Sequence, residues 1–144
     1  MKAWVAGHDQ AVAEWAGDRT GFNFFAMYSA FGIVGADGFL EGACIFSDYY
    51  PGGNVEMTYV GSGTLTRAII RHIGYYAYQT LGVSRITAKT KRRNATVCRL
   101  LPKAGFEFEC IQKRYYGPNK DDDAVVYSLP ISKAERWLKG NHNG

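Results

Sequence analysis

The pattern of hydrophobic and polar positions is clearest between residues 55 and 80. Residues 55–60 alternate between apolar and other side chains, which predicts a strand that buries at least one face. After a break at Gly61-Ser62-Gly63, apolar residues recur at three- and four-residue spacing, which predicts an amphipathic helix. Its inner face is predicted to hold Leu65, Ile69, Ile73, Tyr76 and Thr80, and its outer face Arg67, Arg71, Tyr75 and Tyr78.

The glycine-bearing turn between this strand and helix is a candidate anion site. The first N–H groups of a helix have no partner within it, and small residues let a ligand approach them closely. The turn could therefore hold a phosphate. A tight strand-to-helix connection with no ligand is an equally good interpretation of these residues alone, since turns containing glycine are common.

The first half of the chain predicts a short strand, a helix and a hairpin. Residues 2–5 form the strand, and Asp9 caps a helix that reaches Ala16 and is ended by Gly17, with Val12, Trp15 and Ala16 turned inward. Residues 22–28 are aromatic without a clear period and fit a helix or a strand. The apolar runs 31–36 and 39–46 form a hairpin around a two-residue Asp37-Gly38 turn.

The second half predicts two further strands around a second helix, followed by a hairpin. Val83–Lys89 is a strand, and the helical crossover makes it parallel to the 55–60 strand. Adjacent parallel strands can splay where a ligand enters. Asn94 begins a helix that Gly105 closes and Pro102 kinks or shortens. Alternating residues at 106–110 and 124–129 form the final hairpin, and Trp137 and Leu138 form a short helix.

Composition places the chain among ordinary proteins of one domain. Its 144 residues are 47% hydrophobic and 21% charged, with no signal-like start and no apolar run that could cross a bilayer, so we expect a cytoplasmic protein. Three widely spaced cysteines predict reduced thiols in the core and no metal site. The net charge of +4 suits an anionic small molecule, a nucleic acid or an acidic protein equally well.

The order of these elements resembles the GNAT superfamily of acyl-CoA-dependent N-acetyltransferases. The resemblance is strongest in the segments 85–88, 93–95, 103–109 and 123–129, and in the eleven-residue step from Asn94 to Gly105. It implies an α/β (α+β) fold: a mixed, mostly antiparallel twisted sheet with a splayed parallel pair, flanked by helices, in a single domain over residues 1–144. It also implies acetyl-CoA as co-substrate and an amine acceptor.

The resemblance implies where CoA binds, although the turn departs from the family pattern. In the family, a Gln/Arg-x-x-Gly-x-Gly/Ala turn holds the pyrophosphate, but here Gly61 stands at the basic position and threonines at the last two small ones. Hydroxyl groups of Thr64 and Thr66 could bond phosphate oxygens instead, and Lys91-Arg92-Arg93 could meet the 3′-phosphate. The predicted cofactor-binding residues are Tyr59, Val60, Gly61, Ser62, Gly63, Thr64, Leu65, Thr66, Arg67 and Asn94.

A second departure concerns catalysis. Many family members carry a tyrosine seven residues after the helix-starting asparagine as the acid for the CoA thiolate, and that position is Leu101 here. Tyr59, Tyr115 and Tyr116 are the other phenols, of which Tyr59 and Tyr115 are our candidates. Glu56 resembles the family's general base, which would deprotonate the amine, and an ion-paired strand carboxylate is the alternative role.

The remaining residues leave further interpretations open. Glu41 is the second candidate base, and His72 is expected to be structural because it lies in mid-helix. Basic residues and tyrosines in 89–93 and 113–116 also fit nucleic-acid binding or base modification on the same scaffold. Leu101 and the altered turn fit a CoA-binding or interaction module without catalysis. A homodimer is compatible with the sequence.

Overall fold

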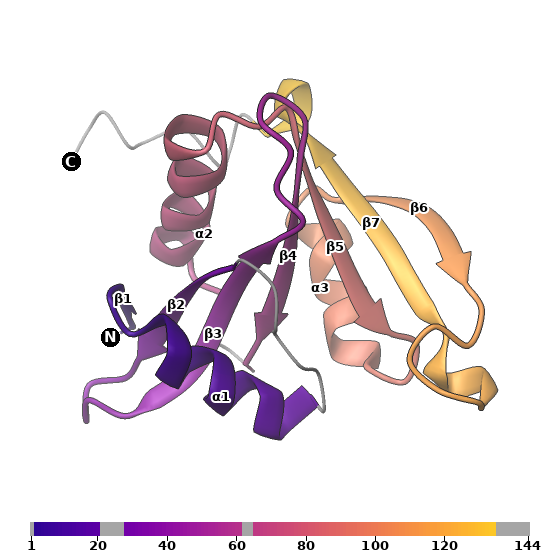
Figure 1. Ribbon diagram of the computed structural model, residues 1–144, viewed down its shortest axis with the longest axis horizontal. Coiled ribbons are helices and arrows are strands. Elements are labelled where there is room, and N and C mark those ends of the chain that lie inside the picture. Colours follow the sequence, from indigo (N-terminus) through magenta and orange to yellow (C-terminus); the bar gives the residue numbers. More distant parts are fainter. Residues whose placement is uncertain (1, 21–27, 62–64, 135–144) are drawn as a thin grey trace.

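Seven strands form one sheet in the order β1-β2-β3-β4-β5-β7-β6 (Figure 1). The computed structural model describes residues 2–20, 28–61 and 65–134. The strands are β1 (Ala3–Val5), β2 (Ser29–Val34), β3 (Leu40–Ser47), β4 (Asn54–Val60), β5 (Arg85–Lys91), β6 (Glu107–Gln112) and β7 (Ala124–Pro130). The helices are α1 (Asp9–Thr20), α2 (Arg67–Gly74), α3 (Ala95–Lys103), the π-helix η1 (Tyr75–Thr80) and the 3₁₀ turns η2 (Lys120–Asp122) and η3 (Ile131–Lys133).

Helices cover the two faces of the sheet unequally. Helices α2 and α3 lie behind the sheet and α1 lies in front of it (Figure 1). The larger core packs α2, η1 and α3 on alternate residues of the strands, including Phe46, Met57 and Ile86. The smaller core packs α1 against β2 and β3 through Val12, Ala16, Ala30, Ala43 and Ile45. The mixed, mostly antiparallel sheet predicted from the sequence is confirmed.

Only the pair β4 and β5 is parallel among the described strands. The connection between these strands runs through α2 and η1, which returns the chain to the end of the sheet at which β4 begins. The predicted parallel pair is therefore confirmed. Strand β5 begins at Arg85 rather than Val83, because the N–H groups of Ser84 and Arg85 are donated to the Gly53 carbonyl.

The β2–β3 hairpin is present, but its connection is not the predicted two-residue turn. Gly35 pairs with Phe39, and Gly38 donates its N–H to the Gly35 carbonyl at 3.0 Å. Gly38 has φ +83° whereas Asp37 does not have positive φ. This is a three-residue loop in which a single glycine takes the left-handed conformation. The Asp-Gly pair predicted the position of the loop correctly, but it predicted a loop of two residues where the structure has three.

The helix after β4 changes its winding halfway. Its second half is π-helical, and the Leu81 N–H bonds the Tyr76 carbonyl five residues back. This wider turn rotates the later side chains relative to an ideal α-helix. As a result Tyr78, predicted to face outward, is buried and donates to the Leu129 carbonyl, while Thr80, predicted to face inward, is exposed. The predictions for Ile69 and Ile73 are confirmed.

Helix α3 contains Pro102 and continues to Lys103. A proline lacks the N–H that would bond the carbonyl four residues earlier, here that of Cys98. The Tyr127 hydroxyl donates to this carbonyl at 3.1 Å, so a strand residue replaces the missing bond. Gly105, with φ +103°, then ends the helix as predicted, and Phe106 bonds back to the Leu101 carbonyl.

The final hairpin, β6–β7, is confirmed, whereas the predicted end of helix α1 and the predicted burial of all three cysteines need correction. Helix α1 passes Gly17 and ends at Thr20, because Arg19 and Thr20 donate side-chain hydrogen bonds to carbonyls of the preceding turn. Strand β6 is an exposed edge, and Phe108 on it is 59% exposed. Of the cysteines, only Cys44 is buried, and Cys110 on β6 is exposed. Residues 22–27 and the helix predicted at Trp137 and Leu138 lie outside the described residues.

Candidate functional site

The parallel strands β4 and β5 separate halfway along their length. Their register runs from Asn54 opposite Arg85 to Met57 opposite Ala88. Beyond that point β4 stays with β3 as far as Val60, and β5 stays with β7 as far as Lys91. The carboxyl-terminal parts of the two strands therefore leave an opening between them, which we call the splay (residues 58–60 and 89–91). This is the predicted splayed pair.

Two adjoining cavities lie at the splay and share Arg19, Thr20, Tyr59 and Asn94. One has a volume of about 430 Å³ and reaches Gly61 and the start of α3. The other, of about 320 Å³, is lined by residues of both separated strands, including Thr58 and Lys89. The splay thus opens onto the N-terminus of a helix, where free N–H groups favour an anionic ligand.

Glu56 and Lys89 form an ion pair at the point where the strands part. The Glu56 Oε1 atom lies 3.2 Å from the Lys89 Nζ atom, and the side chains are 19% and 15% exposed. The two residues share a face because Glu56 pairs with Thr87, two residues before Lys89. The Lys89 ammonium also lies 4.8 Å from the centre of the Tyr115 ring.

Charge and burial act on Lys89 in opposite directions. Burial lowers its pKa, but the Glu56 carboxylate and the Tyr115 hydroxyl outweigh this, so the pKa of Lys89 lies above its ordinary value. Burial, and then the Glu56 carboxylate, raise the pKa of Tyr116. The site therefore keeps a lysine cation and a neutral phenol near neutral pH.

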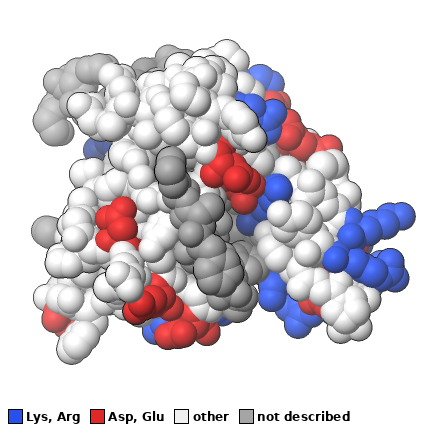
Figure 2. Space-filling model, viewed as in Figure 1, with Lys and Arg blue, Asp and Glu red and all other residues white. Residues whose placement is uncertain are grey.

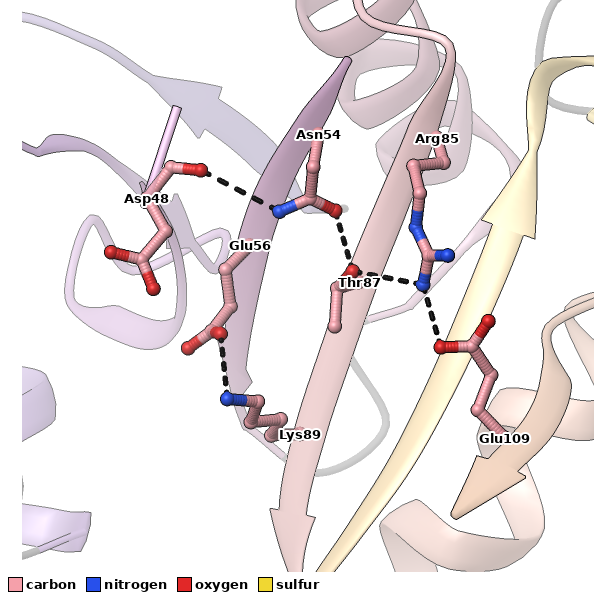
Figure 3. A network of polar contacts seen from close by, with 7 residues as sticks. All are labelled: Asp48, Asn54, Glu56, Arg85, Thr87, Lys89 and Glu109. Carbon is pink, nitrogen blue, oxygen red and sulfur yellow. Dashed lines mark hydrogen bonds and ion pairs between the residues drawn. The ribbon is translucent and has the colours of Figure 1, made fainter. Parts of the chain in front are cut away.

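A chain of polar contacts lies beside this pair (Figure 3). The Thr87 hydroxyl donates to Asn54 Oδ1 at 2.5 Å and accepts from Arg85 at 3.1 Å, and Arg85 reaches Glu109 at 2.7 Å. Asn54 donates to the Asp48 carbonyl at 3.5 Å. These contacts tie the paired ends of β4 and β5 together below the splay.

Several of the predicted cofactor-binding residues lie together. Tyr59, Val60, Gly61 and Asn94 line the cavity that reaches α3, and Asn94 caps that helix by accepting the Val97 N–H. Thr66 caps α2 by accepting the Ile69 N–H at 3.3 Å, and Arg67 is the first helical residue. Leu65 packs against the larger core. Ser62, Gly63 and Thr64 lie outside the described residues.

The predicted catalytic residues are distributed differently. Tyr59 packs against the larger core and lines the splay, whereas Tyr115 approaches Glu56 through Lys89 on the opposite face. Glu41 lines the 430 Å³ cavity and is paired with Lys2. Leu101 is 3% exposed within the core. His72 stacks on Trp4 with ring centres 5.4 Å apart, in keeping with a structural role.

Sequence reasoning grouped Lys89 with the basic residues 89–93 but did not place it beside Glu56, and it missed the roles of Asp122 and Asp123. Polar residues at every second position of β5, namely Arg85, Thr87, Lys89 and Lys91, are the pattern that could have placed Lys89 beside Glu56. Asp122 pairs with Arg93, and Asp123 accepts the Arg114 N–H at 2.8 Å. The two aspartates thereby fasten the β5–α3 loop to the β6–β7 hairpin, although both read as loop residues in the sequence.

A separate basic region lies at the end of the β6–β7 hairpin. A cavity of about 340 Å³ is lined there by Ile111, Asp123 and four basic residues, Arg92, Lys113, Arg114 and Lys120. Figure 2 shows Lys and Arg side chains gathered over the hairpin side of the molecule, whereas acidic and basic side chains adjoin at its centre. Arg92 is paired with Asp123 at 3.3 Å.

The order of elements, the crossover helix and the splay between β4 and β5 define the chain as having the fold of the GNAT N-acetyltransferases. The fold that the resemblance implied is therefore confirmed. No family sequence model matches the chain, and no curated protein matches it in sequence. The fold is recognised through solved structures.

Those structures include the spermidine/spermine N-acetyltransferase SpeG from Vibrio cholerae. One form of it matches with a TM-score of 0.74 at 12% identity, over 93% of this chain and 97% of that one. A GCN5-related N-acetyltransferase from Brucella melitensis matches with a TM-score of 0.63 at 18% identity, over 77% of this chain and 54% of that one. No described helix has the length and apolar character needed to span a membrane.

Proposed function

We propose that the protein transfers an acetyl group from acetyl-CoA to a primary amine. The observation that carries the proposal is the Glu56 carboxylate at the point where β4 and β5 part, next to a cavity bounded by both strands. An amine attacks a thioester only after it loses a proton, and a carboxylate in a partly dry site can accept that proton. The fold supports the acyltransferase class, whereas the proposal of this reaction rests on the site.

The described residues fit an elongated ligand with phosphates at one end. The 430 Å³ cavity joins the splay to Gly61, where φ is +132°, a conformation that favours glycine. The chain continues from Gly61 to α2, whose first N–H groups would face a phosphate. We assign the phosphates to residues 61–67, the pantetheine arm to the splay beside Tyr59 and Val60, and the thioester to the neighbourhood of Glu56.

The acceptor side of the site is the face that carries Glu56, Lys89 and Tyr115. Glu56 takes the amine proton, directly or through a water, and the neutral amine then attacks the thioester carbon. Structures with similar folds include spermidine N-acetyltransferases, so polyamines belong in the first acceptor screen. Peptides with a free amino terminus or a lysine side chain form the second group.

The test is thiol release from acetyl-CoA in the presence of these acceptors, with the acetylated product detected by mass spectrometry. We expect product that depends on both substrates. A protein that binds acetyl-CoA but acetylates neither polyamines nor peptides would favour the CoA-binding module without catalysis. A protein that does not bind acetyl-CoA would contradict the proposal altogether.

A further inference from the structure

Lys89 is an unexpected neighbour for a general base, because its ammonium group already occupies one side of the Glu56 carboxylate. We propose that Lys89 supplies the fixed positive charge that stabilises the departing CoA thiolate, in the place of a proton-donating tyrosine. This assignment rests on the proposed function, because it concerns the same reaction. It makes Lys89 a catalytic residue and assigns no proton transfer to it.

Leu101 creates the need for such a group. Its side chain is apolar, 3% exposed and packed in the larger core, so its position can supply neither a proton nor a charge. Tyr59 lies on the core face of β4, opposite the face of Glu56. Tyr116 has a raised pKa, chiefly through burial, which makes its phenol a weaker acid than usual. Lys89 is the cation that joins the cavity to the Glu56 carboxylate.

The geometry keeps the ammonium in the reacting region. A nitrogen that hydrogen-bonds the Oε1 atom of Glu56 at about 3 Å lies within about 6 Å of Lys89 Nζ, because Nζ is itself 3.2 Å from that oxygen. Lys89 also lines the 320 Å³ cavity between the strands. The Glu56 carboxylate and the Tyr115 ring both contact its ammonium group, so the charge is positioned before the reaction begins.

The step balances without a proton from Lys89. The acceptor ammonium first loses one proton, which Glu56 takes and passes to solvent. The neutral amine then bonds the acetyl carbon, the nitrogen gives its second proton to Glu56, and the carbon–sulfur bond breaks. The sulfur leaves as a thiolate with the electron pair, beside the Lys89 ammonium. Solvent later removes the proton from Glu56 and protonates the thiolate. The thiolate therefore carries one negative charge, which the single positive charge of the Lys89 ammonium can offset.

The acidities of the thiol and of the Lys89 ammonium favour charge stabilisation by Lys89 over proton donation. A thiol has a pKa of about 8.5, and an unperturbed lysine one of about 10.4. The pKa of Lys89 is raised further, because the Glu56 and Tyr115 contributions exceed the effect of burial. Proton transfer from Lys89 to a thiolate would therefore run uphill, whereas the cation can stabilise the thiolate at every pH at which the enzyme works.

The test measures the thiol pKa of CoA bound to the protein, from the ultraviolet absorbance of the thiolate during a pH titration. We expect wild-type protein to lower this pKa by about one unit or more from its free value, because a cation lies beside the sulfur. Lys89→Arg should keep the shift. Lys89→Gln, which retains a donor for Glu56 without the charge, should abolish it. Lys113→Met is the control, because it removes a lysine that lines the cavity on the β6–β7 hairpin and neither cavity at the splay.

Kinetics with an active acceptor provide the second readout. Lys89→Gln should lower kcat by about 10²–10³ with little change in KM for acetyl-CoA, and Lys89→Arg should restore most of it. Melting curves of each variant check that it is folded. An unchanged thiol pKa in Lys89→Gln would overturn the assignment while leaving acetyl transfer standing. If wild-type protein does not bind CoA, the proposed function and this assignment both fail.

Discussion

At the scale of single residues, carboxylates paired with cations have two different roles. Glu56 lies at the splay, where its partner Lys89 comes from the neighbouring strand. Asp123 is buried in a hairpin end and accepts bonds from the Arg114 backbone and the Arg92 side chain. The first arrangement leaves the carboxylate beside a cavity, whereas the second uses the carboxylate to fix a loop.

Replacing Glu56 with glutamine tests the base directly. We expect turnover near neutral pH to fall by about 10²–10⁴ while affinity for acetyl-CoA is kept, because the amide cannot accept the amine proton. Part of the loss should return at higher pH, where more acceptor is already neutral. Steady-state kinetics over a pH series provide the measurement. Glu41→Gln is the matched variant, and if it shows the larger loss, the base is Glu41.

Asp123 should contribute to stability only above a limiting pH. The Arg114 N–H first, and then Arg92, hold the pKa of Asp123 below its ordinary value. A group whose pKa is lowered by folding stabilises the folded state above its unfolded pKa of about 3.9 and loses this contribution as the pH falls toward the folded value.

We therefore expect Asp123→Asn to lower the free energy of unfolding at pH 6 and to matter progressively less below about pH 4. Urea unfolding at several pH values gives the comparison. Asp121→Asn is the control, because Asp121 is exposed on the neighbouring turn. A difference between the two variants that does not change with pH would rule out the carboxylate charge as the cause.

At the scale of elements, a hydrogen bond across the core joins helix α3 and strand β7. The Tyr127 hydroxyl occupies the Cys98 carbonyl because Pro102 offers no N–H. We expect Tyr127→Phe to destabilise the fold by about 1–3 kcal/mol, the usual cost of leaving a buried acceptor unpaired. In a Pro102→Ala background the new N–H can reach that carbonyl, so the same change should cost less. Chemical unfolding of the double-mutant cycle measures the coupling, and additive effects would contradict it.

The elements that sequence patterns predicted best are those with a strong local period. The 55–60 strand, the parallel β5 and the helix capped by Asn94 follow from alternation, a crossover and a cap. The errors share a different cause, which is tertiary context. The π-helix depends on where the Tyr76 and Tyr78 side chains find partners, and the exposure of Cys110 depends on the edge position of β6.

The candidate site was predictable only in part. Glu56 could be singled out by residue type and strand position, and Asn94 by its cap. The ion pair to Lys89 could not, because it depends on the register of β4 and β5, which no local pattern specifies. The buried aspartates at 122 and 123 were missed for the same reason. Their arginine partners lie about thirty positions earlier in the chain.

At the scale of the whole molecule, ligand binding should appear as added stability. A ligand bound only by the folded state contributes RT ln(1 + [L]/Kd), or about 2.7 kcal/mol at a hundred times Kd. We therefore expect millimolar acetyl-CoA to raise the melting temperature by several degrees. Adenosine alone, which lacks the pyrophosphate and the pantetheine arm, should raise it far less. Equal shifts would indicate that the splay is not the binding site.

The basic cavity on the β6–β7 hairpin allows a separate test of nucleic-acid binding. Each phosphate that a protein neutralises releases counterions, so such binding falls steeply with salt. If the cavity lined by Arg92, Lys113, Arg114 and Lys120 binds nucleic acid, fluorescence anisotropy with single-stranded RNA should show binding at 50 mM salt that Lys113→Met weakens. No binding at 50 mM salt would remove this interpretation.

Amide hydrogen exchange with and without acetyl-CoA tests the central claim most directly, because it locates the ligand as well as detecting it. The N–H groups of residues 58–60 and 89–91 lie where β4 and β5 no longer pair with each other. We predict that acetyl-CoA slows exchange there and at the start of α2, and leaves β1 and β6 unchanged. Protection confined to the β6–β7 hairpin, or no protection anywhere, would contradict an acetyl-CoA site in the splay.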